Sequence, residues 1–75
     1  MQELIEYIAK NLASKPEDVR ITTEEGDGRV VLKLEVAEED KGKIIGRQGR
    51  VAQAMRTLLR VAAVKDGTRA ILEIV

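Results

Sequence analysis

The sequence has 75 residues, enough for one domain over residues 1–75 but not for a second. Cysteine and histidine are both absent, which excludes disulfides, thiol catalysis and the commonest metal ligands, so we expect no cofactor. The formal net charge is zero, one tyrosine is the only aromatic residue and no apolar run has a membrane-spanning length, so we expect a cytoplasmic domain with an aliphatic core.

The first half of the chain is predicted to form one helix and a β-hairpin. Apolar residues recur at helical spacing over 2–13, and this helix ends before Pro16 because proline disfavours helical conformation in the preceding residue. Apolar and polar residues then alternate over 19–24 and 29–36, which indicates two antiparallel strands with a glycine-containing turn at 26–28. The inward residues are Leu4, Ile5, Ile8 and Leu12 of the helix, Val19, Ile21 and Thr23 of the first strand, and Val30, Leu32, Leu34 and Val36 of the second.

The second half is predicted to form two helices and a last strand. Residues 37–40 read "AEED", and we expect these acids to lie in solvent at the head of a short helix over 38–45, where they complement the helix dipole. A longer amphipathic helix is predicted over 50–65, ending before Gly67, and a strand over 69–74. The residues expected on the buried face of the long helix are Val51, Ala54, Met55, Leu58, Leu59 and Ala62.

The order helix, strand, strand, helix, helix, strand indicates an α+β fold. A right-handed crossover through the two later helices would place the second and third strands parallel, whereas the hairpin is antiparallel. We therefore expect a three-stranded mixed sheet with three helices on one face.

The zero net charge conceals two oppositely charged segments. Residues 1–40 contain five Lys and Arg against eleven Asp and Glu, a net charge of −6. Residues 41–60 contain six basic residues and no acid, a net charge of +6. A basic segment without acids favours an anionic partner for this part of the chain.

The basic segment contains "GKIIGRQGR" at residues 42–50, with three glycines. Glycine inside a helix costs about 0.8–1 kcal/mol relative to alanine, so Gly42 needs a compensating role. Gly42 and Gly46 are four residues apart and share one helical face, where bare backbone admits either a second helix or a ligand. The sequence leaves both explanations open.

Gly46 and Gly49 enclose two residues between the predicted helices. A helix-to-helix turn explains the glycines through positive φ angles, but it does not explain the charge. Unpaired backbone amides at the start of the second helix, flanked by Arg47 and Arg50, form a site suited to phosphate. The GK[ST] sequence of a nucleoside triphosphate loop is absent, and a helix rather than a strand precedes the loop, unlike in the Rossmann fingerprint.

The run "IIGRQGRVAQAMR" at residues 44–56 resembles the signature of KH domains, in which two aliphatic residues and a GxxG loop precede an amphipathic helix. The additional helix and strand lie on the N-terminal side, which resembles the type II arrangement of this domain. The whole sequence is similar to the KhpA family of small bacterial single-KH RNA-binding proteins.

The resemblance implies that single-stranded RNA lies in a groove between the two helices, with a reach of about four nucleotides at the loop. A role as an RNA chaperone or post-transcriptional regulator follows from the same resemblance. One or two of the three groove candidates are expected to belong to the core instead. The candidate backbone contacts are Gly46, Arg47, Gln48 and Gly49, with Arg50, Lys43 and Lys41 adding attraction, and the groove candidates are Ile44, Ile45 and Val51.

A single site of this kind should bind weakly, because the chain has almost no aromatic side chains on which bases stack. The resemblance implies a homodimer, or a heterodimer with the larger Jag-type (KhpB) RNA-binding protein, and two linked sites would compensate through avidity. Val61 and Val64 project towards the polar side of the long helix. They are either ordinary exposed apolar residues or part of such an interface.

Three other functions were weighed against RNA binding. Catalysis is not expected, because histidine and cysteine are absent and the basic segment has no acid to serve as a general base. A protein-interaction module that uses the long helix, with a basic face that is only solvated surface, is the main alternative. Single-stranded DNA is a lesser alternative ligand, since nothing in the sequence requires contact with the 2′-hydroxyl that distinguishes RNA from DNA.

Overall fold

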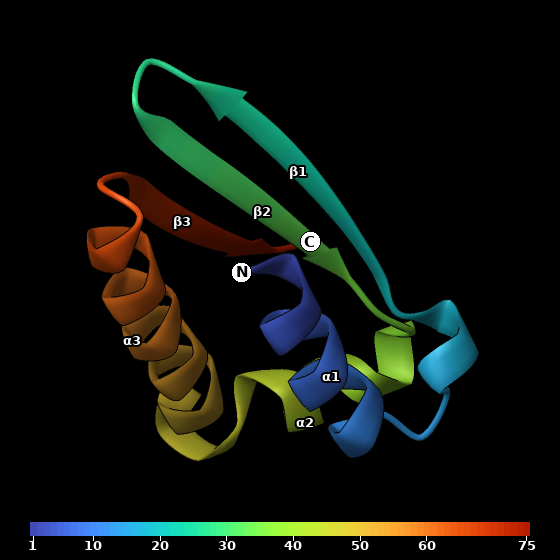
Figure 1. The fold of residues 1–75 in the computed structure, drawn as a ribbon. Helices are drawn as coiled ribbons and strands as arrows, with labels where there is room; N and C mark the ends of the chain where they lie inside the picture. Colours follow the sequence, from blue (N-terminus) through green and yellow to red (C-terminus); the bar gives the residue numbers. More distant parts are fainter.

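The computed structural model describes residues 1–75 and has the predicted α+β element order (Figure 1). Short 3₁₀ turns lie between the main elements. No helix combines the length and apolarity that a membrane crossing requires. The helices are α1 (Gln2–Leu12), α2 (Lys41–Ile45) and α3 (Arg50–Lys65), the strands are β1 (Arg20–Gly26), β2 (Arg29–Glu35) and β3 (Arg69–Ile74), and the 3₁₀ turns are Pro16–Asp18, Glu38–Asp40 and Arg47–Gly49.

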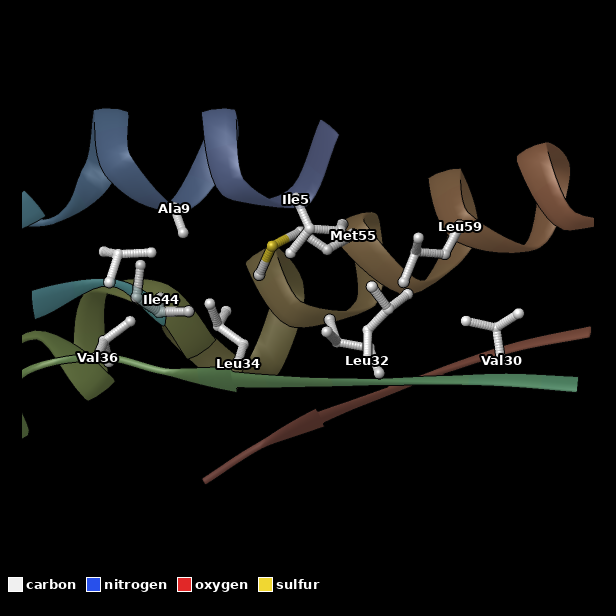
Figure 2. Close-up of a cluster of buried hydrophobic side chains, with 11 residues drawn as sticks. Ile5, Ala9, Val30, Leu32, Leu34, Val36, Ile44, Met55 and Leu59 are labelled. Atoms are coloured by element: carbon white, nitrogen blue, oxygen red, sulfur yellow. The ribbon is translucent and has the colours of Figure 1, made fainter. Parts of the chain in front are cut away.

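The three strands form one mixed sheet in the order β1, β2, β3. β1 pairs antiparallel with β2, and β2 pairs parallel with β3, as predicted. All three helices cover the same face of the sheet (Figures 1 and 2). On the opposite face the register places Thr22, Lys33 and Glu73 side by side, and these polar side chains suit a surface in contact with water.

The hairpin turn is tighter than predicted. Gly26 pairs with Arg29, so only Asp27 and Gly28 form the loop, with φ angles of 50° and 74°. Two consecutive positive φ angles are typical of a type I′ turn, whose twist matches that of the flanking strands. Thr23 was expected to face the core, but it is exposed, and its hydroxyl donates a 2.8 Å hydrogen bond to the Gln2 side chain at the start of α1. The helical layer ends near this point, so no helix covers the rest of β1 (Figure 1).

The core is aliphatic and lies between β2 and the helices (Figure 2). Every inward side chain of β2 is buried, which confirms the alternation predicted for this strand. Ile5 and Ala9 of α1 and Met55 and Leu59 of α3 close over these side chains from above. The β2 residues and their continuation are Val30, Leu32, Leu34 and Val36.

The buried face of α3 differs from the predicted one. Ala54 is exposed and Leu58 is 44% exposed, although both were expected in the core. The predicted apolar stripe covers a wide arc of the helix, and the alanines on either side of it do not indicate which edge packs on the sheet. The residues that α3 does bury are Ala52, Met55, Leu59 and Ala63.

Candidate nucleic-acid interface

A short loop of special backbone geometry joins α2 to α3. Gly46 ends α2 with φ 80° and ψ 171°, and the 3₁₀ turn Arg47–Gly49 follows it. Within this turn Gln48 has φ 57° and Gly49 has φ 73°, both in the left-handed region. A non-glycine residue in this region is uncommon, and such residues concentrate at functional sites. The loop lies at the end of the molecule where α2 and α3 meet (Figure 1).

The two glycines of the loop are required for different reasons. A Cβ built on Gly46 would lie 2.8 Å from Cβ of Val51 and 2.9 Å from its backbone nitrogen, so this position has no room for a side chain. Gly46 also occupies a backbone region that is essentially restricted to glycine. Nothing lies within 4 Å of a Cβ built on Gly49, so this residue contributes its left-handed φ and leaves the space in front of it open.

The loop presents polar side chains to solvent, whereas the amides of Gly46 and Gly49 donate to backbone carbonyls of the chain. Arg47 and Gln48 are exposed, and Arg47 forms no ion pair within 4 Å. No side chain caps the start of α3, whose Ncap residue is Gly49. The first amides of a helix have no partner within the helix and carry a partial positive charge, so this end of α3 suits a phosphate group.

The lysines and arginines of the basic segment differ in their pairing. Lys41 forms a 3.0 Å salt bridge with Glu38, and Lys43 donates a hydrogen bond to the hydroxyl of Ser14. These two predicted contacts are therefore already engaged within the chain. None of the arginines of the basic segment takes part in a salt bridge, so their positive charges are unpaired. They are Arg47, Arg50, Arg56 and Arg60.

The three candidates for the apolar groove are separated by their exposure. Ile44 is fully buried and is therefore the candidate that belongs to the core, as expected for one or two of the three. Ile45 is 39% exposed, and Val51 is half-buried beside Gly46. Ile45 is therefore the exposed isoleucine of the five-residue α2, and Val51 lies in the first turn of α3.

Gly42 lies on bare, exposed backbone. No atom is found within 4 Å of a Cβ built on it, so helix-to-helix packing does not explain this glycine. The backbone of α2 is therefore open on the side that Gly42 occupies.

The family of the chain follows from comparison with known proteins. A sequence model of the family described as "KhpA/KhpB, KH domain" matches residues 2–74. The chain belongs to the KhpA/KhpB family of KH domains. The loop from Gly46 to Gly49 lies between helices α2 and α3 of this domain.

Proteins named "RNA-binding protein KhpA" are similar to the chain over its whole length. The one from Clostridium perfringens (strain 13 / Type A) is 47% identical over 75 residues, which is all of both chains. Those from Treponema pallidum (strain Nichols) and Listeria monocytogenes serovar 1/2a are 49% and 48% identical and cover 99% and 100% of this chain, and 92% and 99% of their own. No solved structure matches the chain significantly. The KhpA/KhpB family is non-enzymatic, in agreement with the sequence analysis.

Asp40 is a residue of the KhpA/KhpB domain that sequence reasoning missed. It was expected in solvent with the neighbouring acids, but it is fully buried and is the only buried charged residue. Its two carboxylate oxygens accept hydrogen bonds of 3.0 Å from the backbone amides of Ser14 and Lys15. These bonds hold the pKa of Asp40 below its ordinary value, and the charge of Lys43 acts in the same direction.

Asp40 fixes α2 against the chain that leaves α1. Next to it, Lys15 forms a 2.9 Å salt bridge with Glu39, which raises the pKa of Lys15 through the hydrogen bond between the two side chains. Asp40 directly precedes α2 and thus anchors the helix that carries the loop. The three consecutive acids of the sequence give no sign of which one is buried, because the partners of Asp40 lie 25 and 26 residues away.

Proposed function

We propose that the chain binds single-stranded RNA through the loop of residues 46–49 and the adjoining aliphatic surface, as an RNA chaperone or post-transcriptional regulator. The observation that carries this proposal is the loop itself. An uncapped helix start, open backbone at Gly42 and Gly49, and the unpaired arginines Arg47 and Arg50 converge there. The names of the full-length relatives, which describe RNA-binding proteins, support RNA as the ligand.

Each part of the loop has a separate task in this proposal. Arg47 binds phosphate through the paired donors of its guanidinium group, and the Gln48 amide donates to phosphate or sugar. Gly49 and Gly42 let the sugar-phosphate chain approach the backbone. Ile45 and Val51 supply apolar surface to the bases, and Lys41 and Lys43 add screened attraction in spite of their internal partners.

The double variant Arg47→Asp/Gln48→Asp tests this mechanism. Short labelled RNA is titrated at about 50 and about 200 mM salt, and contacts to two to four phosphates predict a log–log salt slope of about −1.4 to −2.8 for the natural chain. We expect the variant to lose at least about tenfold in affinity and to show a shallower slope. Arg20→Asp/Thr22→Asp is the matched control, since it changes charge equally on the exposed face of β1. Unchanged affinity in the loop variant, with its fold intact by circular dichroism, would refute the mechanism.

We further propose that α3 supports a homodimer, or a heterodimer with a Jag-type (KhpB) protein. Val61 and Val64 are 54% and 71% exposed, and Leu58 lies one turn before Val61 with 44% of its surface exposed. A monomer gains little from these apolar side chains, whereas a partner would bury them. This surface is also the observation that favours the alternative function, a protein-interaction module.

Val61→Asp tests the interface by sedimentation equilibrium. We expect the natural chain to dimerise and the variant to dissociate at least about tenfold more readily, because the new carboxylate would be buried without a partner. Thr22→Asp, on the open face of the sheet, serves as the control that leaves association unchanged. A natural chain that stays monomeric at high concentration, or a variant that associates as strongly, argues against α3 as the interface.

A further inference from the structure

A concave surface lies at the opposite end of α3 from the loop. It has a volume of about 410 Å³ and lies between the last turns of α3 and the beginning of β3. This volume falls within the range of about 300–1,000 Å³ that is typical of small-ligand sites. Its lining combines apolar side chains with two arginines, and consists of Arg60, Ala63, Val64, Thr68, Arg69, Ala70 and Ile71.

The two arginines of this hollow have no acidic partner. Arg60 and Arg69 are exposed, and neither takes part in a salt bridge. Arg69 also pairs in register with Arg29 across the parallel strands, which adds a third positive charge at this edge of the sheet. An apolar surface flanked by unpaired guanidinium groups is complementary to a nucleotide, whose base is apolar on its faces and whose phosphate is anionic.

A row of basic side chains connects the hollow with the loop. Arg56 and Arg60 are four residues apart and therefore share one side of α3, and Arg60 lines the hollow. Arg60 lies beside β3, because it lines the hollow together with residues of that strand, whereas Leu58 lies on the other side of the line of buried residues. β3 is an edge strand that pairs with β2 alone, so its outer backbone edge is unpaired beside the hollow.

The separation of the two sites sets the length of RNA that reaches both. From Gly49 to Arg60 the helix rises about 16 Å, at about 1.5 Å per residue. A stacked single strand that rises about 3.4 Å per nucleotide along its axis covers this distance in roughly five nucleotides. An RNA of about four nucleotides held at the loop therefore stops short of the hollow, whereas one of about ten nucleotides spans both.

We propose that an RNA held by the loop continues along the basic side of α3 and places a further nucleotide in the hollow beside β3. This inference rests on the proposed function of the loop. The phosphate of this nucleotide lies between Arg60 and Arg69, and its base lies on the apolar surface lined by Ala70 and Ile71. The second site extends the footprint of the domain beyond the nucleotides that the loop holds.

The test compares two lengths of oligouridine, about four and about ten nucleotides, by fluorescence anisotropy. We expect Arg60→Gln/Arg69→Gln to lower the affinity for the longer RNA on the order of tenfold, to reduce its salt slope by about 0.7, and to leave the affinity for the shorter RNA within about twofold. Lys10→Gln/Arg20→Gln removes the same charge far from α3 and should change neither affinity. Both variants alter exposed side chains, so each is expected to fold.

The outcomes distinguish the two proposals. An equal loss for both RNA lengths, or no loss for the longer one, would overturn the second site and leave the hollow to another ligand, such as a protein side chain. If Arg47→Asp/Gln48→Asp abolishes binding of the shorter RNA while the hollow variant has no effect, the loop mechanism stands and only this inference fails. If the loop variant binds both lengths normally, the proposed function fails as well.

Discussion

At the level of single residues, substitution by alanine is expected to cost more stability at Gly46 than at Gly49, although the two glycines cannot be told apart in the sequence. Alanine at Gly46 must displace the Val51 backbone and adopt a backbone region open to glycine only, so we expect a loss on the order of 3 kcal/mol in the free energy of unfolding. Alanine at Gly49 contacts no other atom, so we expect it to lower the free energy of unfolding only by the cost of its left-handed conformation, about 1 kcal/mol. Urea denaturation measures both values, and equal losses in the two variants would contradict the crowding at Gly46.

The buried carboxylate of Asp40 makes stability depend on pH. Its pKa in the folded chain lies below 3.8, its ordinary value, so the unfolded chain takes up the proton first as the pH falls. The stabilisation is therefore complete above about pH 5 and is lost as the pH falls through the lowered folded pKa. Removing the charge should remove this part of the pH dependence.

Asp40→Asn tests this linkage through urea midpoints at about pH 7 and about pH 3. We expect the variant to be less stable at neutral pH, because the amide group cannot accept both hydrogen bonds from Ser14 and Lys15. We also expect a smaller loss of stability than in the natural chain when the pH is lowered. Glu38→Gln, at an exposed acid of the same segment, is the control, and parallel pH profiles for natural chain and Asp40 variant would contradict the role of Asp40.

At the level of secondary-structure elements, Gly42 makes the five-residue helix α2 less stable but leaves its backbone open. Gly42→Ala should raise the free energy of unfolding by up to about 1 kcal/mol, because alanine favours helix and the added methyl group meets no other atom. We expect RNA affinity to fall severalfold in the same variant, since the methyl group obstructs approach of the sugar-phosphate chain. Unfolding and RNA titration of one protein sample measure both effects. Higher stability with unchanged affinity would show that Gly42 has no part in binding.

The order and type of the elements could be predicted because their patterns are local. β2 shows the clearest alternation, and all its inward residues are buried. The rotation of α3 about its axis could not be predicted, because apolar residues extend over both Ala54 and Ala52 and only packing on β3 selects between them. Burial of Asp40 depends on the backbone amides of Ser14 and Lys15, which follow α1, and no local sequence pattern predicts this contact.

The candidate site was predictable to a similar degree. The glycines and arginines of the loop are adjacent in sequence, so their juxtaposition needed no tertiary information. The separation of Ile44 from Ile45 did need it, since one isoleucine enters the core and its neighbour faces solvent. The hollow beside β3 is formed by two segments that meet only in the folded chain, and no sequence pattern indicates it.

At the scale of the whole molecule, the distribution of charge matters more than its sum. Every salt bridge uses an acid from the first forty residues, so the acidic half of the chain is partly neutralised by its N-terminus, its own lysines and Lys41. The arginines at the loop and along α3 have no such partners. The longest dimension of the molecule is 34 Å, so a polyanion bound along α3 contacts much of its length. A net charge of zero is therefore compatible with binding of nucleic acid at one side.

A nuclear magnetic resonance titration shows whether the loop of residues 46–49 holds the RNA backbone. Nitrogen-15-labelled protein is titrated with single-stranded RNA of about ten nucleotides, and the backbone amide shifts are followed residue by residue. We expect the amides of Gly46 to Gly49 and of the first turn of α3 to show the largest changes, with smaller ones along the basic side of that helix. Changes confined to the open face of the sheet or to the surroundings of Val61, with the loop amides unmoved, would contradict this expectation.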